Sequence, residues 1–185
     1  MGARSSQVAG SKAGAHGGTP LQIRPVNVLA KSRALKTILI AGAIAGVLDI
    51  TYACIFNYLR IGMTPMAVLH SVAGGAVGRE TAQAGGVKTA ALGLFFHFLI
   101  ATTAAAVYYL ASRVIRFMIT HAVISGILYG LCVYLFMYGI IFRVAAFHST
   151  RLPWQYPWIV LLCNLGIHMF GIGLPIALVT RKFSK

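Results

Sequence analysis

Acidic residues are almost missing from this sequence. Of its 185 residues only two are Asp or Glu, against sixteen Lys or Arg, and the formal net charge is +14. Charged residues make up 10% of the chain, whereas soluble domains contain about 25%. This scarcity excludes a soluble enzyme, because a water-soluble globule needs more polar cover. The apolar content of 58% and the mean hydropathy of +0.81 also exclude a disordered chain.

Catalytic and metal-binding motifs are also missing. The three cysteines, Cys54, Cys132 and Cys163, form no CxxC pair and lie within apolar runs, which argues against a disulfide or a metal cluster. There is no GxSxG, no phosphate-binding loop and no pair of carboxylates. We therefore expect no enzyme, no catalytic residue, no resident metal and no cofactor. The basic residues are not interleaved with aromatic residues, so no nucleic-acid partner is expected either.

What the sequence does contain is four long apolar runs, at residues 35–58, 89–112, 117–142 and 157–180. Crossing a bilayer takes about 20 mostly apolar residues. Backbone amides in hydrocarbon must pair within the chain, so each run should be a helix. The sequence thus predicts an all-α membrane protein, a four-transmembrane-helix bundle over residues 35–182. Residues 1–34, rich in Gly, Ser and Ala, are predicted to form a flexible basic tail.

A shorter helix is predicted at residues 64–78, after the first span. Thr64-Pro65 is a typical helix start, with a capping hydroxyl and proline at the first helical position. Apolar residues then recur at helical spacing, but the run is too short to cross. We expect either an interfacial helix or a re-entrant segment.

The distribution of basic residues predicts the orientation. The tail, the turn between the second and third spans, and the C-terminus together carry more Lys and Arg than the opposite side. By the positive-inside rule both termini are cytoplasmic, in a multi-pass protein of a bacterial inner membrane. We expect the bilayer itself to be the main partner, with anionic lipids bound by the basic tail.

Small residues recur at the spacing that lets membrane helices approach closely. The first span contains Gly42 and Gly46, the third contains Gly126 and Gly130, and the fourth contains Gly171. We assign these glycines first to helix packing within one chain. The second assignment is self-association, as a homo-oligomer or within a larger membrane complex.

Asp49 is the one acid inside a span, and it shares a helix face with Gly42 and Gly46. A carboxylate near mid-bilayer costs about 2.5–3.5 kcal/mol, so it needs a partner or a proton. Three further polar residues lie at a similar depth: His97 on the second span, and Asn164 and His168 on the fourth. Counting about 1.5 Å of rise per residue, all four fall within a layer about 6 Å deep. We call Asp49, His97, Asn164 and His168 the polar layer.

Three interpretations of the polar layer remain open. The first is a buried latch that fixes the register of the helices. The second is a proton-titratable or solute-contacting site, because histidine titrates near neutrality and intramembrane acids serve proton relays. The third is a metal or haem site that uses His97 and His168, although no ligand spacing supports it and the two differ in depth.

Three segments resemble a group of small four-span bacterial inner-membrane proteins, more distantly the YagU-type family of unknown function. They are residues 41–49, residues 92–98 and the ending 167–178. The resemblance covers about residues 36–180 and implies a bacterial inner-membrane location, but no activity. We therefore expect a non-enzymatic structural, interaction or accessory subunit. The alternatives are a small proton-linked transporter or channel that uses the polar layer, and a haem- or metal-binding redox protein.

Overall fold

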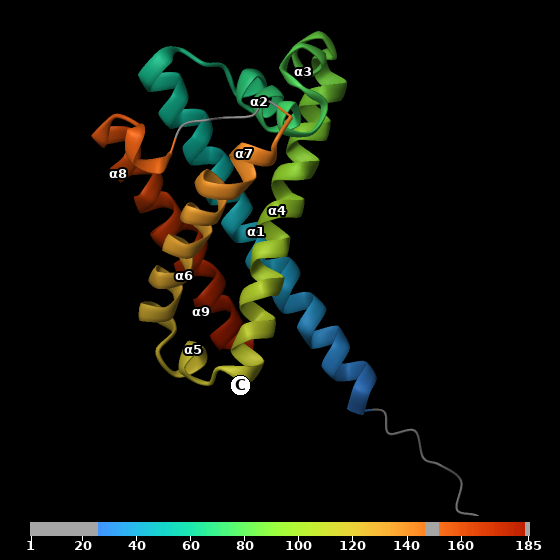
Figure 1. Ribbon diagram of the computed structural model, residues 1–185. Coiled ribbons are helices and arrows are strands. Elements are labelled where there is room, and N and C mark those ends of the chain that lie inside the picture. The colour runs from blue at the N-terminus through green and yellow to red at the C-terminus, as the bar shows by residue number, and fades with distance from the viewer. Residues whose placement is uncertain (1–25, 147–151, 184–185) are drawn as a thin grey trace, which may run out of the picture.

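The computed structural model describes residues 26–146 and 152–183, and the regular structure of these two stretches is helical throughout (Figure 1). In this part of the chain four helical runs are long and apolar enough to cross a membrane: Lys31–Ile61, Gly86–Val114, Ala122–Val144 and Trp158–Phe183. The predicted fold class, an all-α membrane protein built as a four-helix bundle, is confirmed.

The first helix, α1 (Val26–Ile61), starts earlier than predicted. Residues 26–34, which we assigned to a flexible tail, belong to this helix. No glycine or proline occurs between Val26 and Ala41, so nothing in the sequence ends the helix where the apolar run ends. The rest of the predicted tail, residues 1–25, lies outside the described residues. In Figure 1 the first turns of α1 project away from the other helices.

A short helix follows the first span, as predicted. The elements here, in chain order, are α2 (Pro65–Val77), α3 (Arg79–Ala84) and the second spanning helix α4 (Gly86–Val114). Thr64 caps α2, because its Oγ1 accepts a hydrogen bond from the amide of Ala67 at 3.3 Å. A Cβ at Gly93 of α4 would clash with the carbonyl oxygen of Leu69, so α2 packs directly on the α4 backbone.

The third span is interrupted, and the prediction of one helix over residues 117–142 is wrong at its start. Its elements are α5 (Phe117–Thr120), α6 (Ala122–Phe136), the π-helical segment η1 (Met137–Ile141) and α7 (Phe142–Val144). The carbonyl oxygen of Met118 accepts hydrogen bonds from the Tyr108 hydroxyl at 2.9 Å and from Ser125 Oγ at 3.1 Å. In a continuous helix this carbonyl would bind the amide of residue 122. The two hydroxyls therefore stabilise the break at His121.

The fourth span also changes helix type along its length. Its elements are the 3-10 turn η2 (Pro153–Gln155), α8 (Trp158–Gly166), the π-helical segment η3 (Ile167–Gly173) and α9 (Leu174–Phe183). π-helical turns are rare, and the hydropathy pattern carries no sign of them. Both π segments, η1 and η3, lie inside spanning helices that we predicted as regular.

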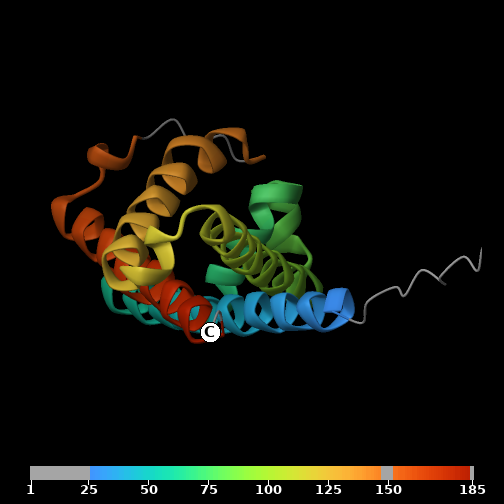
Figure 2. The ribbon, with the colours of Figure 1, turned by 90° about the horizontal axis from the view of Figure 1, so that it is seen from below.

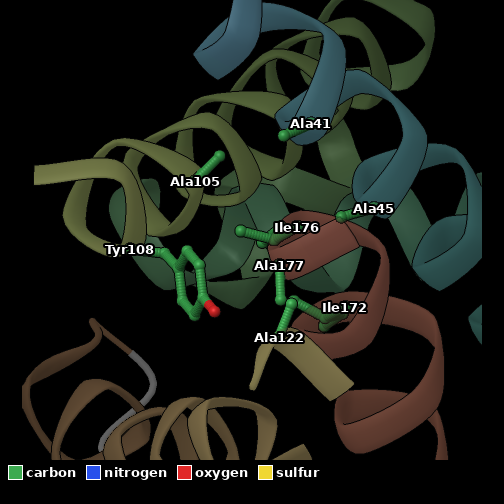
Figure 3. Packing of buried hydrophobic residues seen from close by; sticks show 8 residues of the cluster. All are labelled: Ala41, Ala45, Ala105, Tyr108, Ala122, Ile172, Ile176 and Ala177. Atoms are coloured by element: carbon green, nitrogen blue, oxygen red, sulfur yellow. The ribbon is translucent and has the colours of Figure 1, made fainter. Parts of the chain in front are cut away.

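The centre of the bundle is built mainly from small side chains. Helices α1, α4, α6 and α9 and the segment η3 contribute the eight residues of the buried cluster drawn in Figure 3: Ala41, Ala45, Ala105, Tyr108, Ala122, Ile172, Ile176 and Ala177. Seen from the end of the bundle in Figure 2, α9 lies between α1 and α6, and it contacts both. Alanine at these positions lets the helix backbones approach closely, which is how helices associate in lipid.

Candidate functional site

Asp49 of α1 lies against α4. One turn earlier, a Cβ at Gly46 would lie 2.8 Å from two ring carbons of Phe98, so the two helices are in close contact. This approach places Oδ2 of Asp49 4.0 Å from Nδ1 of His97. The Asp49 side chain is 24% exposed and that of His97 is 11% exposed. The bundle therefore encloses most of both side chains.

The backbone holds His97 in one tautomer. Its Nε2 lies 2.9 Å from the carbonyl oxygen of Gly46, and because a carbonyl only accepts, Nε2 must carry the hydrogen. The nitrogen that faces Asp49 is then Nδ1. In a neutral ring Nδ1 bears a lone pair, which would repel a carboxylate. A proton either on Nδ1 or on the Asp49 carboxyl group would remove this repulsion.

Asn164 and His168 join the same region from the fourth span. The hydroxyl of Tyr52 on α1 donates to Oδ1 of Asn164 at 3.0 Å. The Nδ1–H of His168 donates to the backbone carbonyl of Asn164 at 2.8 Å, because a carbonyl accepts. The segment η3, which carries His168, also packs against α1. The structure thus brings the four residues of the polar layer together.

Tyr52 is a member of this site that the sequence analysis did not single out. It follows Asp49 by three residues, so both lie on one helix face. This three-residue spacing is the feature of the sequence that could have identified Tyr52 as part of the site. The hydroxyl donates to a residue 112 positions away, and a contact of that range leaves no local mark in the sequence.

Two tyrosines of the third span pack against the ring of His168. The ring centroid of Tyr134 lies 5.3 Å from that of His168, and that of Tyr138 lies 6.2 Å away, both in edge-on geometry. Tyr134 is 2% exposed, and its hydroxyl has no hydrogen-bond partner among the described residues. The position of these tyrosines beside His168 was not predicted from the sequence.

Both π segments lie at the polar layer. η3 contains His168, and η1 contains Tyr138, whose ring faces that histidine. A π-helical turn changes the direction of the side chains relative to an α-helix, and such turns occur frequently at functional sites. The two π-helical distortions of the spanning helices therefore lie where polar side chains meet.

The predicted packing glycines lie at close contacts within this one chain. A Cβ at Gly42 would lie 2.6 Å from Cα of Thr102 on α4, and one at Gly126 would lie 2.9 Å from the carbonyl oxygen of Gly173. Gly130 sits equally close to the His168 backbone, where a Cβ would lie 2.7 Å from the carbonyl carbon. These glycines lie at two close backbone contacts between helical segments, α1 with α4 and α6 with η3, and we call these contacts the seams. At the fifth position, Gly171, a Cβ would clash with Ile167 of its own helix and would lie 3.9 Å from Leu48 of α1.

The site offers one carboxylate, two imidazoles and several hydroxyls. Across residues 26–146 and 152–183, no three His, Cys, Asp or Glu side chains gather closely enough to hold a metal ion. Groups of this kind can share a proton and can hold helices together through polar contacts.

Comparison with known proteins adds no further evidence. No family model, no curated protein and no solved structure matches the chain. The resemblance to YagU-type proteins therefore stays a prediction.

Proposed function

We propose that the chain is a multi-pass protein of a bacterial inner membrane with both termini in the cytoplasm. Seven of the eleven described lysines and arginines lie at the end of the bundle that carries the start of α1, the α4–α5 turn and the end of α9. An excess of positive charge favours the cytoplasmic side. Reporter fusions at Lys185 and within residues 147–151 test this orientation, and a periplasmic C-terminus would overturn it.

Within that membrane we propose a non-enzymatic role, as a structural, interaction or accessory subunit whose polar layer acts as a latch. The observation that supports a latch is that its side-chain contacts join different helices. Asp49 with His97 joins α1 to α4, and Tyr52 with Asn164 joins α1 to α8. Polar contacts of this kind stabilise helix pairs in lipid by about 0.6–2 kcal/mol.

A second candidate, a small proton-linked transporter or channel, is favoured by one specific feature. His97 is held with Nδ1 toward Asp49, so a proton can reside on either group without a change of tautomer. Intramembrane acids paired with histidine are typical of proton relays. The haem alternative, through His97 and His168, would be favoured by a Soret band in the purified protein.

Asp49→Asn separates the latch from the proton-linked candidate. The full-length protein is reconstituted into vesicles that contain a pH-sensitive dye, and the unfolding free energy is measured in the same lipid. For a latch, wild type shows no proton flux above that of empty vesicles. A double-mutant cycle of Asp49→Asn with His97→Gln then gives a coupling energy of about 1 kcal/mol. Glu80→Gln, a change of the other acid on the exposed helix α3, is the matched control and leaves stability unchanged.

The outcomes are distinct. Proton flux in wild type that Asp49→Asn abolishes, with unfolding unchanged, would replace the latch with the proton-linked candidate. A coupling energy near zero together with no flux would refute both roles for the Asp49–His97 pair.

A further inference from the structure

One end of the bundle carries a group of exposed cations on elements that touch. α9 contacts both α1 and α5 at this end, which Figure 2 shows from below. Seven exposed basic side chains lie there, and we call five of them the basic rim: Arg33, Lys36, Arg116, Arg181 and Lys182. Three different segments of the chain, far apart in sequence, thus bring positive charge to one boundary of the bundle.

The chain supplies no acidic side chain to balance this charge. Asp49 lies inside the bundle, and Glu80 lies on α3 at the opposite end. Within residues 26–146 and 152–183, none of the basic rim residues forms an ion pair with an acid. No acid among the described residues balances this charge, so the rim presents it to an anionic partner.

Exposed apolar side chains border the same rim. Val114 is 84% exposed, Ile115 is 51% exposed and Phe117 is 47% exposed, all in the turn that carries Arg116. Phe183, directly after Lys182, is 43% exposed. Long basic side chains at the ends of membrane helices extend their charge toward the headgroup level while their stems stay on apolar surface. A ligand that fits both features has an anionic head and an apolar body.

We propose that the basic rim binds the phosphate headgroups of anionic phospholipids, with their acyl chains against the apolar side chains of the α4–α5 turn. This site belongs to the folded bundle and, apart from Arg33, is separate from the lipid binding expected of residues 1–34. Lipid binding at the basic rim depends on the membrane-spanning fold, and it is expected whether the polar layer is a latch or a proton site. Each Lys or Arg near an anionic membrane surface strengthens binding about fivefold.

The test uses full-length protein in phosphatidylcholine vesicles doped with spin-labelled phosphatidylglycerol or spin-labelled phosphatidylcholine. The motionally restricted fraction of each probe gives its relative association with the protein. Wild type should prefer phosphatidylglycerol. In the triple variant Arg116→Gln/Arg181→Gln/Lys182→Gln, the preference for phosphatidylglycerol over phosphatidylcholine should fall at least about tenfold. Each cation strengthens binding about fivefold, and salt screens part of this effect.

A matched control removes the same charge at the other end of the bundle, through Arg60→Gln/Lys88→Gln/Arg143→Gln. This variant should retain the wild-type preference for phosphatidylglycerol. Residues 1–34 are present in every protein, so their contribution cancels, and the unfolding temperature of each variant verifies its fold. Equal losses in the two triple variants, or no loss in either, would overturn the proposal.

A further arm separates a lipid from a soluble anion. Inorganic phosphate or glycerol phosphate is added in the millimolar range to wild-type vesicles at constant ionic strength. The spin-labelled phosphatidylglycerol should stay bound, because neither anion offers acyl chains to Val114 and Phe117. Displacement of the lipid by either anion would show that the rim is a site for free phosphate, which contradicts the proposal.

Discussion

Gly173→Ala should destabilise the bundle strongly. A Cβ at this position of η3 would clash with the carbonyl oxygen of Gly126 and would lie 2.5 Å from the amide nitrogen and 2.7 Å from Cα of Gly130. All three are backbone atoms of α6, so no side chain can rotate away. The helices must separate by roughly 1 Å to restore ordinary contact distances. Overpacking costs about 1–3 kcal/mol where side chains can yield, so we expect a loss of about 3 kcal/mol here.

The matched control for this variant is Gly166→Ala, in the same helical run. Apart from its own helical turn, no atom of the described residues lies within 4 Å of a Cβ built on Gly166. Alanine there should be neutral or should stabilise α8 by up to about 1 kcal/mol, because glycine is the poorer helix former. Both variants are compared by reversible unfolding in the same bicelles. Equal unfolding free energies for the two would refute the argument that backbone contact along the α6–η3 seam holds the bundle together.

Three smaller predictions follow from polar groups. Tyr134→Phe should leave the unfolding free energy unchanged or raise it by about 1 kcal/mol, since its buried hydroxyl has no partner among the described residues. Tyr108→Phe should lower the unfolding free energy by about 1–2 kcal/mol, because this hydroxyl binds the carbonyl of Met118 and Ser125 Oγ; an unchanged value would contradict that role. Thr64→Ala should cost α2 about 1 kcal/mol through loss of its cap, measured as faster hydrogen exchange of the α2 amides; unchanged exchange would contradict the capping argument.

The spans and the short helix were predictable because each depends on local sequence. A bilayer demands about 20 consecutive apolar residues in a helix, so hydropathy alone finds the four runs. Thr64-Pro65 marks the start of α2 through a cap and a fixed φ, which are also local properties. Depth along a span is set by residue count, and this placed Asp49, His97 and His168 at similar levels.

The partners of these residues were not predictable, because they depend on which helix faces share an interface. The sequence contains no sign that Tyr52 rather than Asp49 binds Asn164. The break at His121 has the same origin, since the Tyr108 hydroxyl reaches the Met118 carbonyl because α5 packs against α4. The early start of α1 was missed for another reason. Hydropathy marks where a helix leaves the hydrocarbon and does not mark where the helix ends.

The seams and the polar layer share residues, so packing and chemistry in this bundle are coupled. Gly46 packs against Phe98 and also presents the carbonyl that holds the His97 ring. Gly130 is in contact with the backbone of His168. A shift of roughly 1 Å along the α6–η3 seam must therefore move His168 relative to the tyrosines of α6 and η1. Gly173→Ala should thus change the NMR signals of the His168 ring, whereas Gly166→Ala should leave them in place, although neither substitution touches that ring.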